Sequence, residues 1–130
     1  MDRVAGRILL VDDEPALLKI MSLYLGRRGY GVATADTTAS AWSQFQAAPS
    51  EFAVAVLDAT MPGLSMQDLA LRMLAANPGL CVIASSGYPW DMTAIEAAAP
   101  GRTMFLHKPF VPEKLADAVR RMIASQEENL

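Results

Sequence analysis

Short apolar runs alternate along this chain with longer segments of helical periodicity. The apolar runs have the length and the β-branched content of strands, and they occupy residues 8–11, 30–35, 52–57, 80–84 and 103–106. In the segments between them, apolar residues recur at three- and four-residue spacing, which indicates amphipathic helices. Strands that alternate with helices in this way form a parallel sheet covered on both faces. We therefore predict an α/β fold with five βα units in a doubly wound arrangement.

The ends of the helices carry recognisable signals. Pro15 suits a first helical turn, and Gly29 suits the left-handed residue that ends the helix of residues 14–28. Thr37 or Thr38 can cap the second helix, because a hydroxyl accepts from a free backbone N–H there. The remaining helices are expected before residues 77–79, over residues 91–99 and from residue 112 to about residue 124.

The length of the chain fits one domain. It has 130 residues, of which 52% are hydrophobic, and this composition predicts a substantial core and excludes a disordered chain. The pattern of strands and helices uses nearly the whole length. We expect an N-terminal lead over residues 1–6, the domain over residues 7–124 and a frayed tail over residues 125–130, with no output domain in this chain.

The charge distribution argues against a nucleic-acid partner. Eleven basic and fourteen acidic residues give a net charge of −3, and residues 29–71 contain no Lys or Arg. A nucleic-acid-binding face needs an excess of basic residues to neutralise phosphates.

Neither a disulfide nor a membrane segment is expected. Cys81 is the single cysteine, which excludes an internal disulfide and is compatible with a reducing compartment. Its place inside an apolar run indicates a buried small hydrophobic residue. The first apolar run is too short for a signal peptide, and no run approaches the ~18 residues that span a bilayer. We therefore expect a soluble, cytoplasmic protein with no membrane partner.

Polar residues stand where the predicted strands end. Asp12 and Asp13 follow the first strand, Asp58 the third, Ser85 and Ser86 the fourth, and Lys108 the fifth. In open α/β sheets, ligands bind at the carboxyl ends of the strands. Acidic residues also favour a helix N-terminus, so the run of residues 12–14 alone would be ambiguous. The presence of Asp58 and Lys108 at the ends of later strands favours a functional site.

Three carboxylates at one edge repel each other and require a positive partner. Lys108 is one candidate, and a bound cation is the other. Oxygen ligands suit Mg²⁺, and no cluster of His and Cys residues argues for zinc. An aspartate carboxylate can also accept a phosphoryl group, while a metal, an ammonium and a hydroxyl neutralise the equatorial oxygens. The set predicts an aspartyl-phosphate site.

Four motifs in this order resemble the receiver domain of bacterial two-component response regulators: LLVDDE, VLDATMPGL, ASSGY and FLHKPF. Each motif is short, but the four together at predicted strand ends are specific, and the resemblance covers about residues 7–124. It implies a flavodoxin-like (βα)₅ fold with strand order 2-1-3-4-5.

The resemblance implies a role for each matching residue. Asp58 corresponds to the phosphoacceptor, which receives phosphate from the phosphohistidine of a histidine kinase or a histidine phosphotransfer protein. Asp12 and Asp13 correspond to the pair that binds Mg²⁺ together with Asp58, and the backbone carbonyl of Thr60 is a further expected ligand. Lys108 corresponds to the lysine that contacts the phosphoryl group.

The remaining motif positions concern the response to phosphorylation. Ser86, rather than Ser85, matches the hydroxyl position, because the small residue Gly87 follows it. Phe105 matches the aromatic switch position but lacks the hydroxyl of a tyrosine. Met66 stands where the family often has glycine, which predicts a different start of the third helix.

The resemblance implies a phosphorylation-controlled switch that is not an enzyme beyond its own phosphorylation and dephosphorylation. Phosphorylation would reshape the face formed by the fourth helix, the fifth strand and the fifth helix. The output then passes through a downstream protein partner or a covalently linked domain, and the chain is either a single-domain regulator or a receiver excised from a hybrid kinase or larger regulator. We expect Thr60 and Tyr88 to flank the path of the hydrolytic water and to tune dephosphorylation.

A haloacid-dehalogenase-like phosphatase is the alternative, because it uses a similar set of residues. Its nucleophile normally opens the chain as Asp-x-Asp, whereas here the acidic pair precedes Asp58, which is followed by Ala59-Thr60. A flavin-binding flavodoxin is disfavoured, since no phosphate loop rich in Ser, Thr and Gly follows the first strand. His107 is expected at an edge or facing a partner, and Trp90 either at an exposed tip or packed over the last helices.

Overall fold

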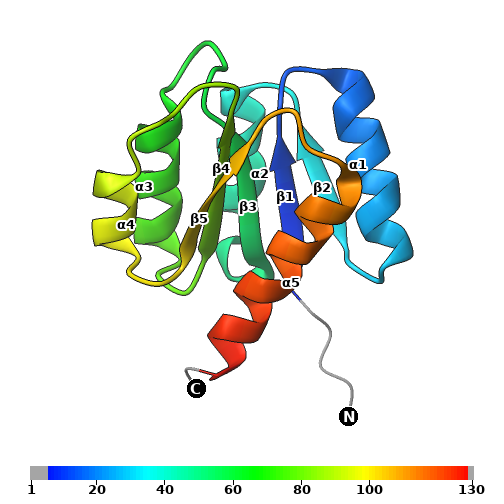
Figure 1. Cartoon of the computed structure of the whole chain (residues 1–130). Helices are drawn as coiled ribbons and strands as arrows, with labels where there is room; N and C mark the ends of the chain where they lie inside the picture. Colours follow the sequence, from blue (N-terminus) through cyan, green and yellow to red (C-terminus); the bar gives the residue numbers. More distant parts are fainter. Residues whose placement is uncertain (1–5, 129–130) are drawn as a thin grey trace.

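The structure is a computed structural model, and it describes residues 6–128. Five parallel strands form one sheet in the order β2-β1-β3-β4-β5, as the resemblance implied. All five carboxyl ends meet at one edge of the sheet, at the top of Figure 1. The strands are β1 (Arg7–Val11), β2 (Val32–Ala35), β3 (Phe52–Asp58), β4 (Cys81–Ser86) and β5 (Thr103–His107).

Five helices cover the two faces of the sheet, as predicted. In Figure 1, α1 and α5 lie together on one face, and α2, α3 and α4 lie on the other. Their bounds are α1 (Pro15–Arg27), α2 (Thr38–Ala47), α3 (Met66–Ala76), α4 (Thr93–Ala98) and α5 (Pro112–Glu128), with a 3-10 turn η1 (Pro49–Glu51) before β3.

Alternate side chains of each central strand enter two separate cores. On β1, Ile8 and Leu10 pack with α1 and α5, whereas Leu9 and Val11 pack beneath α2, α3 and α4. Both faces of the central strands are therefore buried, which explains why their sequences are apolar without polar alternation.

The expected helix ends are present. Thr37 caps α2, because its hydroxyl accepts a hydrogen bond of 3.0 Å from the N–H of Ser40. Gly29 has a φ of 95° immediately after α1, where residues other than glycine are strained.

Several element bounds differ from the predictions. β2 begins at Val32 because Tyr30 still belongs to the turn after α1, its N–H bonding to the carbonyl of Leu25. α4 begins only at Thr93, since the side chain of Asp91 holds the preceding turn. α5 continues through the first part of the predicted tail to Glu128.

A side-chain contact accompanies the longer α5. The amide of Gln126 donates a hydrogen bond to the carbonyl of Gly79 in the turn before β4. The prediction of a frayed segment from Ser125 is therefore wrong for residues 125–128. Residues 1–5 of the predicted lead and residues 129–130 of the predicted tail lie outside the described residues.

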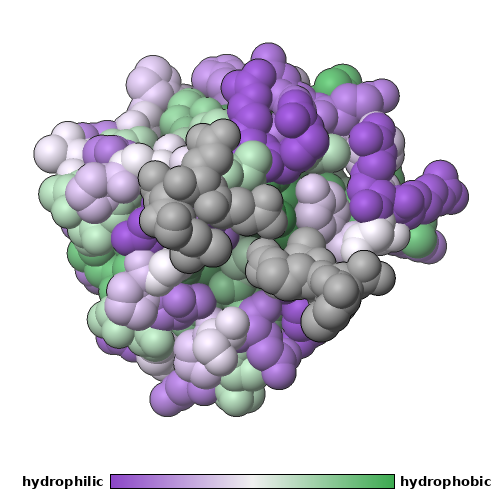
Figure 2. All heavy atoms as spheres, turned by 90° about the horizontal axis from the view of Figure 1, so that it is seen from below, coloured by the Kyte–Doolittle hydropathy of each residue, from purple (hydrophilic) through white to green (hydrophobic). Residues whose placement is uncertain are grey.

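Within residues 6–128, the structure has no helix that is both long and apolar enough to cross a bilayer. Figure 2 views the molecule from below, at the end away from the carboxyl ends of the strands, where hydrophilic and hydrophobic residues are intermingled.

Candidate phosphorylation site

Three carboxylates meet where β1 and β3 end. The register pairs Val11 with Leu57, so Asp12 and Asp58 leave adjacent strands at the same level. One oxygen from each of Asp12, Asp13 and Asp58 lies within 4.8 Å of the others. Asp12 and Asp58 are buried, whereas Asp13 is exposed. The acids that the sequence places at strand ends thus form one cluster.

The Asp58 carboxylate is held in one orientation by the loop that follows it. Its Oδ1 accepts hydrogen bonds from the backbone N–H of Thr60 at 3.0 Å and from the Thr60 hydroxyl at 2.9 Å. Its Oδ2 lies 3.6 Å from the Lys108 ammonium, and the side chain is 1% exposed. The two oxygens therefore have different surroundings.

Lys108 is positioned by the end of the sheet. Its backbone N–H donates to the carbonyl of Ser86 at 2.9 Å, which extends the pairing of β4 with β5. Its ammonium donates to Asp12 Oδ2 at 2.9 Å and to Glu14 Oε1 at 3.2 Å. The ammonium is thus closer to these two acids than to Asp58.

The Glu14 contact is absent from the sequence predictions. Glu14 stands in the acidic run of residues 12–14, but the spacing of residues gives no sign that its side chain reaches Lys108, 94 positions away. The acidic run itself is the only signal that could have pointed to Glu14.

Burial and pairing shift two pKa values in this cluster. Burial raises the pKa of Asp12, and the hydrogen bonds from Lys108 and from the Glu14 N–H only partly oppose that effect. Burial lowers the pKa of Lys108, but the hydrogen bond and charge of Asp12, the charge of Asp58 and the hydrogen bond to Glu14 outweigh burial and raise the pKa overall. Burial therefore disfavours the charged form of Asp12 even with Lys108 beside it.

The donor set fits a hard divalent cation. Asp12, Asp13 and Asp58 offer closely spaced oxygen ligands, and Lys108 supplies a single positive charge against them. Mg²⁺ prefers carboxylate, carbonyl and water oxygens over nitrogen or sulfur ligands. The residues present are consistent with a magnesium site.

Both serines after the apolar part of β4 are buried. Ser85 is paired with Asp58 in the register of β3 and β4, and its carbonyl accepts from the N–H of Ala59 at 2.8 Å. The Ser86 hydroxyl accepts from the N–H of Tyr88 at 3.0 Å. Ser86 is therefore the last residue of β4, two residues beyond the predicted end of this strand, and its hydroxyl is engaged by the following loop.

The aromatic residues near β4 and β5 occupy different environments. Phe105 is half-buried against the core beneath α2, α3 and α4, and Trp90 packs against the same core. Tyr88 is 71% exposed, and its backbone N–H donates to the Ser86 hydroxyl. His107 is exposed at the end of β5, as expected for an edge position. Trp90 is thus a packing residue rather than an exposed tip.

Met66 and Cys81 are both core residues. Met66 is the first residue of α3 and is buried, so the side chain that replaces a frequent glycine packs beneath the helix instead of deforming its start. Cys81 is fully buried, and burial raises its thiol pKa to about 11, which disfavours the reactive thiolate.

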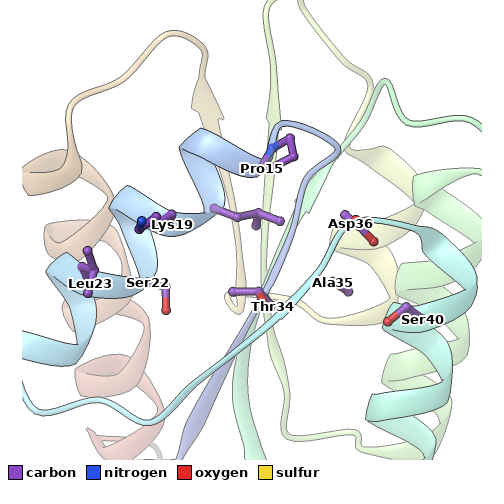
Figure 3. Close-up of a pocket in the computed structure, with 9 residues that line it drawn as sticks. Pro15, Lys19, Ser22, Leu23, Thr34, Ala35, Asp36 and Ser40 are labelled. Carbon is purple, nitrogen blue, oxygen red and sulfur yellow. The ribbon is translucent and has the colours of Figure 1, made fainter.

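A separate groove of about 450 Å³ lies beside the open edge of β2, between α1 and α2. Figure 3 shows Lys19 and Leu23 of α1, Thr34 of β2 and Ser40 of α2 around it. Asp12 and Asp58 do not line the groove, so the acidic cluster is a distinct feature.

Comparison with known proteins gives a consistent result. The family model of the response regulator receiver domain matches residues 8–120. The DNA-binding transcriptional regulator NtrC of Bradyrhizobium sp. is 32% identical over 126 residues, which are 97% of this chain and 26% of that protein. The transcriptional regulatory protein FixJ of Bradyrhizobium diazoefficiens is 30% identical over 94% of this chain and 58% of that protein. The chain thus spans about a quarter of the length of NtrC and somewhat over half of FixJ.

Solved structures agree with the fold. A CheY-like receiver domain protein from Methanospirillum hungatei has a TM-score of 0.81 at 26% identity, covering 96% of this chain and 98% of that one. The response regulator TrrA from Thermotoga maritima, solved in complex with Mg(2+)-BeF, has a TM-score of 0.76 at 25% identity, covering 91% of this chain and 99% of that one. Together with the match over residues 8–120, these findings show that the chain belongs to the response regulator receiver domain family of two-component signalling.

Proposed function

We propose that this chain is a phosphorylation-controlled switch whose Asp58 accepts a phosphoryl group from the phosphohistidine of a histidine kinase or a histidine phosphotransfer protein. Receiver domains are signalling switches rather than classical enzymes, and they interact with histidine kinases and downstream effectors. The observation that carries the assignment of Asp58 is its buried carboxylate, which is oriented by Thr60 and faces the Lys108 ammonium.

The transfer is a displacement at phosphorus. A carboxylate oxygen of Asp58 forms the new P–O bond while the P–N bond to the donor imidazole breaks, and the electron pair of that bond returns to the imidazole nitrogen. The hydrogen bonds from Thr60 fix the carboxylate before the donor arrives, which reduces the entropic cost of reaction. Lys108 supplies a positive charge close to the phosphoryl oxygens.

Asp12, Asp13 and Asp58, together with the backbone carbonyl of Thr60, would hold Mg²⁺. Their spacing and their oxygen ligands support this assignment. A bound Mg²⁺ supplies positive charge that neutralises phosphoryl oxygens during transfer. The protein's own contribution is to keep the Asp12 and Asp58 carboxyl groups buried next to Lys108.

The response to phosphorylation would pass through Ser86 and Phe105 to the face formed by α4, β5 and α5. The new phosphoryl group would draw in the Ser86 hydroxyl, which now accepts from the loop N–H of Tyr88. Phe105 is half-buried against a core that includes Ile95 of α4, so a movement of its ring would alter the packing next to that helix. Driving such an equilibrium from 1:99 to 99:1 takes ~5.5 kcal/mol of differential stabilisation.

Helix α1 offers a docking surface for the phosphodonor. Ile20 and Leu23 are each 53% exposed on this helix, which begins just after the acidic cluster. Leu23 also lines the groove of Figure 3. Apolar side chains one helical turn apart can pack against a helix of a binding partner.

The output of the switch would be a downstream protein partner or a domain covalently linked to this one. NtrC and FixJ are both described as transcriptional regulators, and this chain matches only part of each. The absence of Lys and Arg from residues 29–71 supports a protein rather than a nucleic acid as the direct partner of this domain.

Labelling of the Asp58→Asn variant tests the proposal. The wild-type chain, incubated with Mg²⁺ and a small phosphodonor such as acetyl phosphate, should form one acid-stable, base-labile acyl phosphate per molecule, and Asp58→Asn should form none. Asp36→Asn is the matched control, because it removes an exposed acid after β2. Persistent labelling of Asp58→Asn contradicts the assignment, and many turnovers on varied phosphate esters would support the phosphatase alternative instead.

A further inference from the structure

The side chain of Glu14 takes no part in capping the helix that it precedes. Glu14 is the N-cap residue of α1, yet it makes no capping hydrogen bond with its side chain. Its carboxylate instead accepts from the Lys108 ammonium at 3.2 Å, across the gap between the start of α1 and the end of β5. The preference of helix N-termini for acids therefore does not account for the position of this side chain.

Three carboxylates share one ammonium, and the shortest contacts are not with Asp58. The Lys108 nitrogen lies 2.9 Å from Asp12, 3.2 Å from Glu14 and 3.6 Å from Asp58. An ammonium has three N–H donors, and two of them are directed to Asp12 and Glu14 within hydrogen-bonding distance. The Lys108 ammonium thus lies closer to Asp12 and Glu14 than to the carboxylate that would be phosphorylated.

We propose that Glu14 is a positioning residue that holds Lys108 away from Asp58 and thereby slows phosphoryl transfer to this chain. The proposal rests on the function proposed above for Asp58 and Lys108. A phosphoryl group at Asp58 needs the ammonium next to its oxygens, so the contact with Glu14 must weaken before Lys108 can serve the transition state. Glu14 therefore stabilises the ground state of the site and not the transition state, which raises the barrier.

The exposure of Glu14 allows its effect on Lys108 to be measured without disturbing the core. Its side chain is 63% exposed, so its removal leaves no buried group without a partner, whereas the Lys108 side chain is only 18% exposed. An ion pair with one exposed partner contributes up to ~1 kcal/mol, which corresponds to about a fivefold change in rate at most.

Two substitutions distinguish the effect of the Glu14–Lys108 contact from electrostatic repulsion between Glu14 and the anionic phosphodonor. Glu14→Gln removes the charge at nearly unchanged length. Glu14→Asp keeps the charge but shortens the side chain by one carbon, so the carboxylate no longer reaches Lys108 at its present position. Asp36→Asn, an exposed acid after β2 at the same end of the sheet, is the control for net charge.

The rate of phosphorylation by acetyl phosphate at saturating Mg²⁺ is the first readout. We expect Glu14→Gln and Glu14→Asp to be phosphorylated about twofold to fivefold faster than the wild type, with Asp36→Asn unchanged. If Glu14→Asp matches the wild type while Glu14→Gln is faster, charge repulsion alone operates and the proposal is wrong. Unchanged or slower phosphorylation of both Glu14 variants also overturns it, while normal labelling at Asp58 would leave the proposed function intact.

The second readout needs neither phosphate nor Mg²⁺. In ¹⁵N-lysine-labelled protein in EDTA, the Lys108 ammonium signal is assigned by its loss in Lys108→Arg. We expect faster exchange of its protons with water in both Glu14 variants, because one of its hydrogen-bond acceptors is lost. An unchanged exchange rate in both variants would show that Glu14 does not hold Lys108 in solution, which contradicts the proposal.

Discussion

The ammonium nitrogen of Lys108 lies 2.9 Å from a carboxylate oxygen of Asp12, a residue 96 positions earlier in the chain. The pair joins the ends of β1 and β5, which are separated by β3 and β4 in the sheet. The long side chain of Lys108 thus reaches across β3 and β4 to neutralise Asp12, whose charged form is disfavoured by burial. Charge balance at this edge of the sheet therefore depends on the ion pair between Lys108 and Asp12.

Replacing Lys108 by methionine should destabilise the metal-free protein. The change removes the ammonium that contacts both Asp12 and Asp58, and we expect the free energy of unfolding in EDTA to fall by about 1–3 kcal/mol. Urea denaturation measures the effect, with Lys114→Met on the exposed side of α5 as the control. Mg²⁺ should stabilise Lys108→Met more than the wild type, because it replaces the missing charge; equal stabilisation of both would argue against shared charge compensation.

The raised pKa of Asp12 predicts a specific pH dependence of stability in EDTA. Its pKa in the native state exceeds the unfolded value of 3.8, so the native state binds the proton more readily in the window just above pH 3.8. The contribution of Asp12 to stability is therefore fully present below that window and is lost as the pH rises through it. In the Asp12→Asn variant, the side chain cannot bind a proton in this pH window, so the contribution is absent.

Denaturation midpoints measured from pH 7 down to pH 4 test this dependence. The wild type should gain stability relative to Asp12→Asn as the pH falls, and the difference isolates Asp12 from the exposed acids, such as Asp91 and Glu96, whose pKa values are lowered by hydrogen bonds from Thr93 and Thr103 respectively. Parallel curves for the two proteins would show that the Asp12 pKa is not raised by burial.

Gly63 should not tolerate a side chain. Its φ is 97°, and a Cβ atom there would lie 2.7 Å from the hydroxyl oxygen of Thr38. We expect Gly63→Ala to lower the free energy of unfolding by about 2 kcal/mol, from backbone strain and steric overlap together. Gly26→Ala is the matched control, since nothing surrounds that position in α1, and it should stabilise by about 0.5–1 kcal/mol.

A double-mutant cycle separates the two causes at Gly63. Removing the hydroxyl in Thr38→Ala also removes the acceptor for the N–H of Leu64, so the single change is costly by itself. The pair Thr38→Ala, Gly63→Ala should nevertheless be more stable than the sum of the single changes predicts. Strict additivity would assign the whole effect to backbone strain.

Tyr88→Ala should shorten the lifetime of phosphorylated Asp58. We propose that the ring, two residues after Ser86, obstructs the water that attacks the acyl phosphate, and its removal should speed decay by a few-fold, on the order of 1 kcal/mol in barrier height. Decay is followed by loss of the labelled phosphate after the donor is removed, with Tyr30→Ala as a control away from the site. An unchanged or slower decay would disprove the proposal.

Leu23→Ser should weaken transfer from a kinase without affecting transfer from a small donor. Leu23 is 53% exposed, so its replacement should change stability by no more than about 0.5 kcal/mol. If α1 docks the phosphodonor, the rate from a phosphorylated histidine kinase should fall about tenfold, the effect of losing ~1.4 kcal/mol of contact. Ala47→Ser at the exposed end of α2 is the control; an equal loss with acetyl phosphate would indicate damage to the site rather than to docking.

Much of the fold follows from local patterns. The strands were predictable because burial on two faces makes a strand continuously apolar, as in residues 52–57. The helices were predictable because burial of one helix face places apolar residues at three- and four-residue spacing. The convergence of Asp12, Asp58 and Lys108 was also predictable, since parallel strands bring their carboxyl ends to one edge. The misjudged tail, by contrast, is helical to Glu128, and its Gln126 bonds to Gly79, a contact that no local pattern encodes.

The sequence by itself determined which chemical groups stand at the strand ends, and its resemblance to receiver domains implied the order of the strands. Only the tertiary structure decided how those groups are paired: that Lys108 lies closer to Asp12 and Glu14 than to Asp58, and that Thr60 holds one oxygen of Asp58. The reason is physical. Periodicity and strand termini are properties of neighbouring residues, whereas the partner of a long charged side chain depends on strand register, burial and rotamer across the whole sheet.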